Sequence, residues 1–196
     1  MRYAIGDIHG EYDKLRKLIN IIDKDVTKYI FLGDYIDKGC ESDKVIDFLM
    51  ELEKSKKCIF LMGDHEYMWK KYLETRVIKY LDWLLKYGGR KTIVDNIKLS
   101  DFLTKLVASY DTGDYFLVHA GIKGGKPDYF IRDEFINSRE LYHGKKVIFG
   151  HTAFKKPYID DYKIGIDTGA VYPDMGLLTA FNLDTGEFIY HIGRKE

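Results

Sequence analysis

Five short apolar runs in this chain are each followed at once by glycine together with Asp or His. The blocks are Gly6-Asp7-Ile8-His9-Gly10, Gly33-Asp34, Gly63-Asp64-His65-Glu66, His119-Ala120-Gly121 and Gly150-His151-Thr152. Each apolar run has the length of a buried strand, so each block puts reactive side chains at a strand's carboxyl end. Ligands bind at that edge in open α/β sheets. The pattern therefore predicts one site built from several strand ends.

The spacing of apolar residues predicts the order of the elements. Strands are predicted at residues 2–6, 29–32, 58–62, 115–118 and 146–149. Helical spacing at 11–23 and 42–55 separates the first three strands, and such a βαβαβ run favours a largely parallel, twisted sheet. The last forty residues are rich in strand formers, with a hairpin from Leu177 to Ile192 around Asp184-Thr185-Gly186.

Residues 66–110 interrupt this alternation with aromatic residues and leucines at helical spacing. We expect a mostly helical insertion that covers one side of the sheet near the site. Its aromatic stripe, which includes Trp69 and Trp83, is predicted to pack in the core rather than to hold a cofactor. The chain of 196 residues is then expected to form a single domain, 1–196, with 66–110 as a helical cap.

Charge and composition exclude several classes of protein. Lys plus Arg and Asp plus Glu number 31 each, so no global field attracts nucleic acid or an anionic membrane. No apolar run reaches the roughly 18 residues that a membrane helix needs, and the start of the chain does not resemble a signal peptide. Two cysteines, Cys40 and Cys58, are too few for a disulfide framework. The cytoplasm is the expected compartment.

Six side chains in the five blocks are candidate metal ligands: Asp7, His9, Asp34, Asp64, His119 and His151. Mixed carboxylate and imidazole ligands suit first-row ions such as Mn, Fe, Zn or Co. Six ligands exceed the need of one tetrahedral ion and fit two ions that share a carboxylate. Such a pair can supply a hydroxide at neutral pH and bind the attacking and leaving oxygens of a phosphate ester.

Together the five blocks resemble the calcineurin-like metallophosphoesterases. The most similar branch is that of the phosphoprotein phosphatases, which includes bacteriophage lambda phosphatase and the symmetrical diadenosine tetraphosphatases. Gly88-Gly89 followed by Thr92, and Asp167-Thr168-Gly169-Ala170, add to the resemblance, which runs through the whole chain in the family's order. It implies an α/β fold whose core is a β-sandwich of two mixed sheets flanked by helices, with a helical insertion after the third strand.

The resemblance also implies roles for individual residues. Asp7 and His9 would bind a first ion, Asp34 would bridge two ions, and the second ion would be held by Asp64, His119 and His151. His65 corresponds to the general acid and Asp37 to the carboxylate that orients it. Lys38 and Arg139 correspond to the two phosphate-binding cations. Manganese is the expected ion, with Fe, Zn, Ni or Co as alternatives.

Two residues depart from the family's pattern. Asp64 stands where the family usually has Asn, and Lys38 stands where it usually has Arg. An added carboxylate should hold an ion more tightly, should weaken the ions as Lewis acids, and loses an amide donor. Lysine offers a point charge instead of a planar fork, so it orients phosphate less.

Each block alone has a simpler explanation. A single Asp after a strand is often a turn former or helix N-cap, and a single His is often a buried packing residue. The ordered set favours a phosphatase for phosphate monoesters, above all phosphoserine or phosphothreonine in proteins. The resemblance implies in-line attack by a metal-bound hydroxide. The alternatives are a symmetrical bis(5'-nucleosyl)-tetraphosphate hydrolase, and a regulatory protein that binds metal or phosphate with weakened catalysis. A phosphorylated protein or a small phosphoester is the expected partner, whereas nucleic acid and membrane are not.

Overall fold

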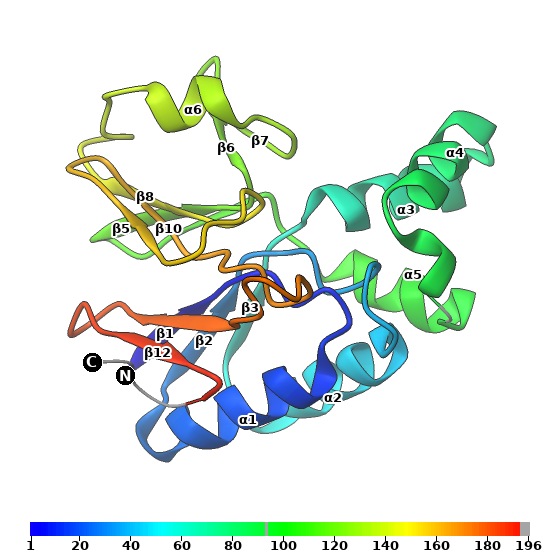
Figure 1. Ribbon diagram of the computed structural model, residues 1–196, viewed down its shortest axis with the longest axis horizontal. Helices are drawn as coiled ribbons and strands as arrows, with labels where there is room; N and C mark the ends of the chain where they lie inside the picture. Colours follow the sequence, from blue (N-terminus) through cyan, green and yellow to red (C-terminus); the bar gives the residue numbers. More distant parts are fainter. Residues whose placement is uncertain (93, 193–196) are drawn as a thin grey trace.

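Two five-stranded sheets lie face to face in the computed structural model, which describes residues 1–92 and 94–192 (Figure 1). The first sheet has the order β12 (Phe188–Tyr190), β11 (Thr179–Asn182), β1 (Arg2–Ile5), β2 (Lys28–Phe31) and β3 (Cys58–Phe60). The second has the order β4 (Ser109–Asp111), β5 (Tyr115–Val118), β8 (Lys146–Phe149), β10 (Lys163–Gly165) and β9 (Tyr158–Ile159).

The parallel strands in both sheets bring the predicted strand ends to common edges. β1, β2 and β3 are parallel, with Tyr3 opposite Tyr29 and Tyr29 opposite Cys58. β5, β8 and β10 are likewise parallel. β11 and β12 add an antiparallel hairpin beside β1, which confirms the predicted hairpin and makes the sheet mixed. The predicted α/β class with two mixed sheets is confirmed.

Helices cover the outer face of each sheet, which gives four layers. Apolar residues of α1 (Tyr12–Ile22), α2 (Ser42–Ser55) and α5 (Asn96–Thr104) pack in one core against the first sheet. A second core lies between the sheets and contains Ile30, Leu117 and Ile148. The third core joins the second sheet to α6 (Asp133–Asn137) and to the hairpin of β6 (Gly121–Lys123) and β7 (Lys126–Asp128). Two short 3-10 turns, Asp23–Asp25 and Gly89–Lys91, complete the elements.

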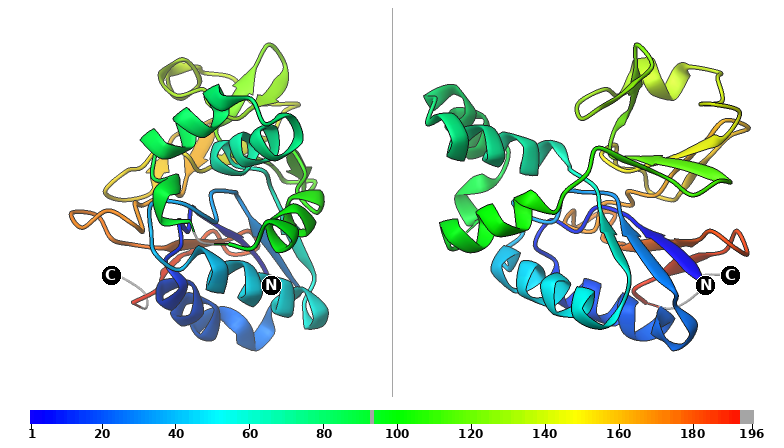
Figure 2. Two further views of the ribbon diagram at one scale, coloured as in Figure 1. Left: turned by 90° about the vertical axis from the view of Figure 1, so that its right-hand side faces the viewer. Right: turned by 180° about the vertical axis from the view of Figure 1, so that it is seen from behind.

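The predicted insertion forms three helices and then returns to the sandwich. α3 (Asp64–Thr75) and α4 (Ile78–Lys86) extend beyond the sheets, and α5 returns beneath them (Figures 1 and 2). The last residues of the segment rejoin the sandwich, because Val107 pairs with Leu61 and β4 joins the second sheet. Residue 93 of this segment, and residues 193–196 of the expected domain, lie outside the described residues. In the described ranges, no helix is long and apolar enough to cross a membrane.

Candidate metal centre

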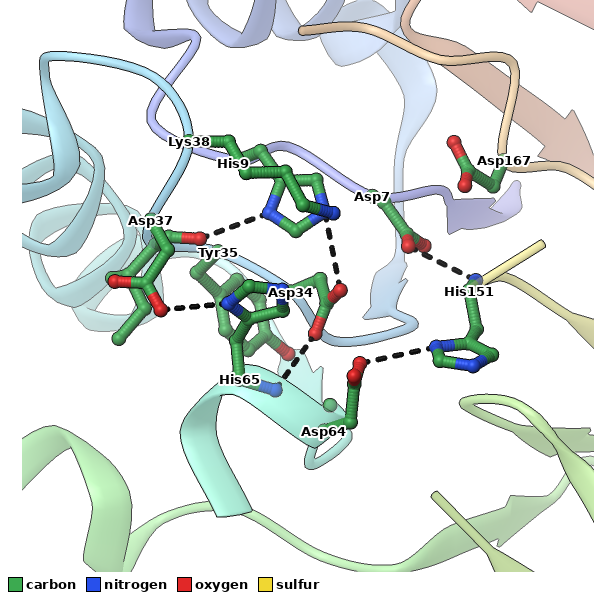
Figure 3. Close-up of polar contacts among 12 residues, drawn as sticks. Asp7, His9, Asp34, Tyr35, Asp37, Lys38, Asp64, His65, His151 and Asp167 are labelled. Carbon is green, nitrogen blue, oxygen red and sulfur yellow. Dashed lines mark hydrogen bonds and ion pairs between the residues drawn. The ribbon is translucent and has the colours of Figure 1, made fainter. Parts of the chain in front are cut away.

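The ends of strands from both sheets converge on one buried cluster (Figure 3). Asp7 and Asp34 follow β1 and β2, and Asp64 is the first residue of α3, directly beyond β3. From the second sheet, His119 follows β5 and His151 follows β8. With His9, these are the six expected ligands, and each is at most 7% exposed. Side chains far apart in the sequence therefore meet because parallel strands place their carboxyl ends together.

One group of candidate ligands contains His9, Asp34 and His65, whose ligand atoms all lie within 4.8 Å of one another. His9 Nε2 lies 3.1 Å from Asp34 Oδ2. His9 Nδ1 lies 2.9 Å from the carbonyl oxygen of Ile36, which accepts its proton and leaves the Nε2 lone pair facing the cluster. The Lys38 ammonium donates to that lone pair at 2.7 Å. The imidazole thus has the tautomer and orientation of a ligand.

A second group contains Asp34, Asp64, His119 and His151, again with ligand atoms within 4.8 Å. Asp64 Oδ1 lies 3.1 Å from His119 Nε2 and 3.0 Å from His151 Nδ1. His119 Nδ1 lies 2.8 Å from the Leu32 carbonyl oxygen, so this imidazole is oriented like that of His9. Asp34 belongs to both groups. The arrangement has the form of two neighbouring sites that share one carboxylate.

The electrostatics of the cluster show an excess of buried negative charge. Burial, together with Asp167 and Asp34, raises the pKa of Asp7 well above its usual range. Burial opposes protonation of His119, but the carboxylates of Asp34, Asp64 and Asp7 outweigh it and raise the pKa of His119 to about 10. The carboxylates thus favour a positive charge among them. A cation placed there would relieve the same repulsion.

Two polar atoms in the cluster have unused lone pairs. Asp7 Oδ2 accepts a hydrogen bond from the His151 N–H at 2.9 Å. Among the described residues, however, neither Asp7 Oδ1 nor His151 Nε2 has a hydrogen-bond partner, although both atoms are buried. Leaving a buried acceptor unpaired costs about 1–3 kcal/mol. The unpaired Asp7 oxygen and the Asp/His donor set fit a divalent metal site.

His65 and Asp37 form a hydrogen-bonded pair beside the cluster. His65 Nδ1 lies 2.6 Å from Asp37 Oδ2, and Asp37 is fully buried. Asp37 also accepts hydrogen bonds from the Trp69 indole, at 3.0 Å, and from the Thr92 hydroxyl. Burial alone would lower the pKa of His65, but Asp34 and Asp37 more than offset burial, so its pKa is raised above 6.5. The imidazole is therefore both fixed and favoured in its protonated form.

Glu66 connects the loop after β2 to the loop after β3 through hydrogen bonds. Its carboxylate accepts the N–H groups of Asp34 and Tyr35, each at 2.9 Å, and of Gly63 at 3.2 Å. The last contact satisfies an N–H at the start of α3, as in a capping box. A Cβ on Gly63 would lie 2.2 Å from Asp34 Oδ1, so only glycine fits beside this carboxylate. Glu66 thus fixes these loops relative to each other.

The backbone of the cluster is unusually strained. Seven non-glycine residues in the described chain have positive φ, and five of them are in this region: His9, Asp34, Asp37, Lys38 and His151. Their φ values lie between 48° and 67°, in the left-handed region. Such residues cost of order 1–3 kcal/mol each and concentrate at functional sites. The surrounding packing therefore holds these side chains in place against their local backbone preference.

A cavity of about 360 Å³ opens beside the cluster. It is lined by Asp34, Asp64, His65, His151, Lys38, Arg132, Trp83, Tyr87, Phe130 and Tyr172. Arg132 also donates to the His151 carbonyl oxygen at 3.0 Å. Two cations and four aromatic rings therefore surround the space next to the candidate ligands. The size is in the range of small-ligand pockets.

The structure does not bring Arg139 to this cavity. Arg139 lines a separate surface pocket with Asn137, Tyr158 and Asp160. The phosphate-binding role predicted for Arg139 is therefore not supported by its position, and Arg132 is the arginine in the cavity lining. The reason is that α6 ends at Asn137, and the following segment leads away from the cavity. No motif surrounds Arg132, so the sequence held no signal for it.

The helical insertion also departs from its prediction. We expected its aromatic stripe to be core, and Trp69 does pack against the core, but Trp83 is only partly buried and lines the cavity, as does the exposed Tyr87. In α4 only Leu84 is fully buried. An amphipathic pattern shows which residues share a helix face, but not whether that face meets a core or a pocket.

Comparison with known proteins agrees with the fold and the cluster. Residues 3–171 match the family model described as calcineurin-like phosphoesterase. The asymmetrical bis(5'-nucleosyl)-tetraphosphatase PrpE of Oceanobacillus iheyensis is 25% identical, and the match covers 97% of this chain and 92% of that protein. The serine/threonine-protein phosphatase PP2A-like PPG1 of Candida albicans is 34% identical over 61% of this chain.

The matches differ in how much of each relative they include. The chain spans only 38% and 28% of the length of two yeast relatives of the serine/threonine phosphatase type. Among solved structures, a cold-active protein tyrosine phosphatase has a TM-score of 0.72 at 19% identity, with 100% of this chain and 77% of that chain covered. A metallophosphoesterase from Sphaerobacter thermophilus has a TM-score of 0.63 at 16% identity, with 97% and 86% covered. These two structures share the fold.

Proposed function

The chain belongs to the calcineurin-like phosphoesterase family, whose members are metal-dependent phosphoesterases, and from this premise we propose that it hydrolyses phosphate monoesters. One observation carries the proposal: two groups of buried Asp and His residues share Asp34 and face a cavity that also contains Lys38 and Arg132. Side chains that can bind metal cations thus lie beside the positively charged side chains that can bind phosphate. Phosphoserine and phosphothreonine in proteins are the proposed substrates.

Asp7, His9 and Asp34 would hold one divalent ion, and Asp34, Asp64, His119 and His151 would hold a second. When bound, such ions act as Lewis acids and lower the pKa of coordinated water. The unpaired Asp7 Oδ1 supports this assignment, because it is a buried acceptor that a cation would use. Manganese is the proposed ion, since imidazole and carboxylate ligands together suit first-row metals.

His65 is proposed as the general acid that protonates the leaving oxygen. It lines the cavity, and Asp37 fixes its Nδ1, so Nε2 is the nitrogen left to deliver a proton. Asp34 and Asp37 raise the pKa of His65, which favours the protonated form that this role requires. Asp37 is proposed to orient the ring and to stabilise its charge.

Lys38 and Arg132 are proposed to bind the phosphate oxygens. Both line the cavity from opposite loops, Lys38 after β2 and Arg132 before α6. The Arg132 guanidinium can offer a planar fork to two oxygens, whereas Lys38 offers a point charge. Arg132 thus supplies the bidentate group that Lys38 lacks.

A second candidate function is hydrolysis of bis(5'-nucleosyl) tetraphosphates. The observation that favours it is the PrpE match, which covers nearly the whole of both chains. That relative is named asymmetrical, whereas the sequence resemblance suggested the symmetrical type. The two reactions differ in products, because symmetrical cleavage of diadenosine tetraphosphate gives two ADP and asymmetrical cleavage gives ATP and AMP.

Turnover of a phosphoserine peptide and of diadenosine tetraphosphate, each with Mn²⁺, tests the choice of substrate. We expect a higher kcat/KM for the peptide. A large preference for the dinucleotide would replace the first proposal with the second, and chromatography of the nucleotide products would assign the cleavage type. Failure to hydrolyse p-nitrophenyl phosphate with Mn²⁺, Ni²⁺, Mg²⁺ or Zn²⁺ would reject both proposals in favour of a regulatory binding protein.

A further inference from the structure

Four aromatic side chains line the cavity, and we call Trp83, Tyr87, Phe130 and Tyr172 the aromatic collar. Tyr87 and Phe130 are each 42% exposed, and Tyr172 is 40% exposed. Large exposed rings gathered around one opening are unusual, because exposed apolar area is normally scattered, and such patches often mark binding grooves. The collar therefore calls for an explanation other than core packing.

The collar is assembled from separate parts of the chain. Trp83 is on α4 and Tyr87 is the residue directly after its end, with ring centroids 4.6 Å apart. Phe130, beyond β7, meets Trp83 edge-on at 6.2 Å and 85°. Tyr67 on α3 holds Phe130 from its other side, at 5.8 Å and 81°. Phe130 thus contacts rings of both α3 and α4.

One end of the collar lies next to His65, the proposed general acid. The Trp83 ring lies 5.1 Å from the His65 ring, at 65°. Across the cavity, the Lys38 ammonium lies 5.6 Å from the centre of the Tyr172 ring. The proposed phosphate position is between Lys38, Arg132 and the metal ligands. A group that leaves toward His65 must therefore lie along Trp83 and its neighbours.

Packing between the insertion and the sheet does not account for the whole collar. Tyr67 and Tyr129 stack at 5.0 Å and would join these parts without help from Tyr87 or Tyr172. Tyr87 and Tyr172 stay exposed, so a large part of each ring faces solvent. A planar ring placed among them would cover this area and would stack in the offset or edge-on geometry that aromatic pairs prefer.

We propose that the aromatic collar binds a planar ring carried by the leaving group, and thereby selects ring-bearing phosphoesters over ring-free ones. This inference rests on the proposed phosphoester hydrolysis at the metal centre and narrows its substrate: phosphoserine and phosphothreonine carry no ring, so among phosphate monoesters the collar would favour a ring-bearing ester over them. A nucleobase and the phenol of tyrosine share the required chemistry. Tyr87 and Phe130 are the residues that determine this preference.

Two substrate pairs test the proposal and distinguish the sources of the ring. AMP and ribose 5-phosphate differ only in the base, and a phosphotyrosine and a phosphoserine peptide of one sequence differ only in the phosphorylated residue. The Mn²⁺-loaded enzyme is compared with Tyr87→Leu and Phe130→Leu, which remove a ring and keep apolar volume. Tyr80→Leu is the matched control, because Tyr80 is on the same helix outside the cavity lining.

We expect each collar variant to lower kcat/KM about 10-fold for the ring-bearing member of at least one pair, in line with the loss of one stacking contact. The ring-free member and all Tyr80→Leu values should stay within about 2-fold. A loss in the AMP pair alone would assign the collar to a nucleobase, and a loss in the peptide pair alone would assign it to tyrosine. Taking ratios within each enzyme cancels the different reactivities of the leaving groups.

An equal change for ring-bearing and ring-free esters, or no change for any of them, would overturn the collar proposal while hydrolysis remains. Absence of hydrolysis in the unmodified enzyme would instead reject the proposed function. Binding gives a second measurement that needs no turnover: AMP should quench tryptophan fluorescence at lower concentration than ribose 5-phosphate does. This difference should shrink in both collar variants, and its persistence would also overturn the proposal.

Discussion

The metal centre and the aromatic collar border the same cavity but are built in opposite ways. The candidate ligands are nearly inaccessible and lie at strand ends of two sheets. Hydrogen bonds fix them: His9 bonds to the Ile36 carbonyl, His119 bonds to the Leu32 carbonyl, and the Asp34 N–H donates to Glu66. The collar is about two-fifths exposed in three of its four rings and comes from a projecting helix and two loops. The comparison suggests that one region performs hydrolysis and the other selects the substrate.

This division gives a common criterion for variants. A change in the metal centre should lower hydrolysis of ring-bearing and ring-free esters by the same factor, because it acts at the phosphate. A change in the collar should alter their ratio. A metal-centre variant that alters the ratio would show that the two regions are not separate.

Asp34→Ala should have the largest effect. Asp34 belongs to both groups of ligands, so we expect loss of metal binding and of activity toward every ester, beyond the roughly 10²–10⁴-fold of a single general acid. Metal content after gel filtration and turnover of AMP and ribose 5-phosphate would measure this. Asp43→Asn is the control, since Asp43 is a surface carboxylate paired with Lys98. Full metal occupancy in Asp34→Ala would refute the shared carboxylate.

His65→Asn should come next, with metal retained and kcat reduced about 10²–10⁴-fold for all esters. The unmodified enzyme should lose activity as pH rises through the pKa of His65, which lies above 6.5, because the proton is then lost. That alkaline decrease should be absent from the variant. His143→Asn, at an exposed histidine, should behave like the unmodified enzyme. An unchanged pH profile in His65→Asn would assign the proton to another group.

Arg132→Ala and Arg139→Ala form a matched pair. Loss of a charge-assisted contact of about 1.5–3 kcal/mol corresponds to a rise in KM of roughly 10–100-fold for Arg132→Ala. Arg139 lines a different pocket, so its variant should keep the KM of the unmodified enzyme. Initial rates across a range of phosphopeptide concentrations would separate the two. The reverse order of effects would restore Arg139 as the phosphate-binding residue.

Asp64→Asn should have the smallest effect. The amide restores the residue usual in the family, removes one negative charge and leaves an oxygen for the metal. We expect metal affinity to fall about 10-fold or less, and kcat at saturating metal to rise by a few-fold. Titration with Mn²⁺, followed by calorimetry and by activity, would show both. Tighter metal binding in the variant would contradict the charge argument.

Local sequence was enough to predict that these Asp and His side chains gather in one cluster, but not the cavity around it. Blocks such as Gly33-Asp34 and Gly150-His151 combine a strand, a glycine and a ligand within a few residues, and parallel pairing then brings them together. Arg132 and Phe130 depend on the path of the loop between β7 and α6, and this path follows from tertiary packing. Trp83 has the helical spacing of a core residue, so its pattern could not reveal the cavity that it faces.

The left-handed backbone at His9, Lys38 and His151 has a consequence for the lifetime of the protein. Each of these residues holds a conformation that costs roughly 1–3 kcal/mol, and the bonds formed elsewhere must compensate for it. Bound ions would add to that compensation, since a ligand at 100 times its dissociation constant contributes about 2.7 kcal/mol. Metal-starved molecules should therefore exchange amide hydrogens faster around the cluster and be degraded sooner. The supply of metal would then regulate the amount of the enzyme as well as its activity.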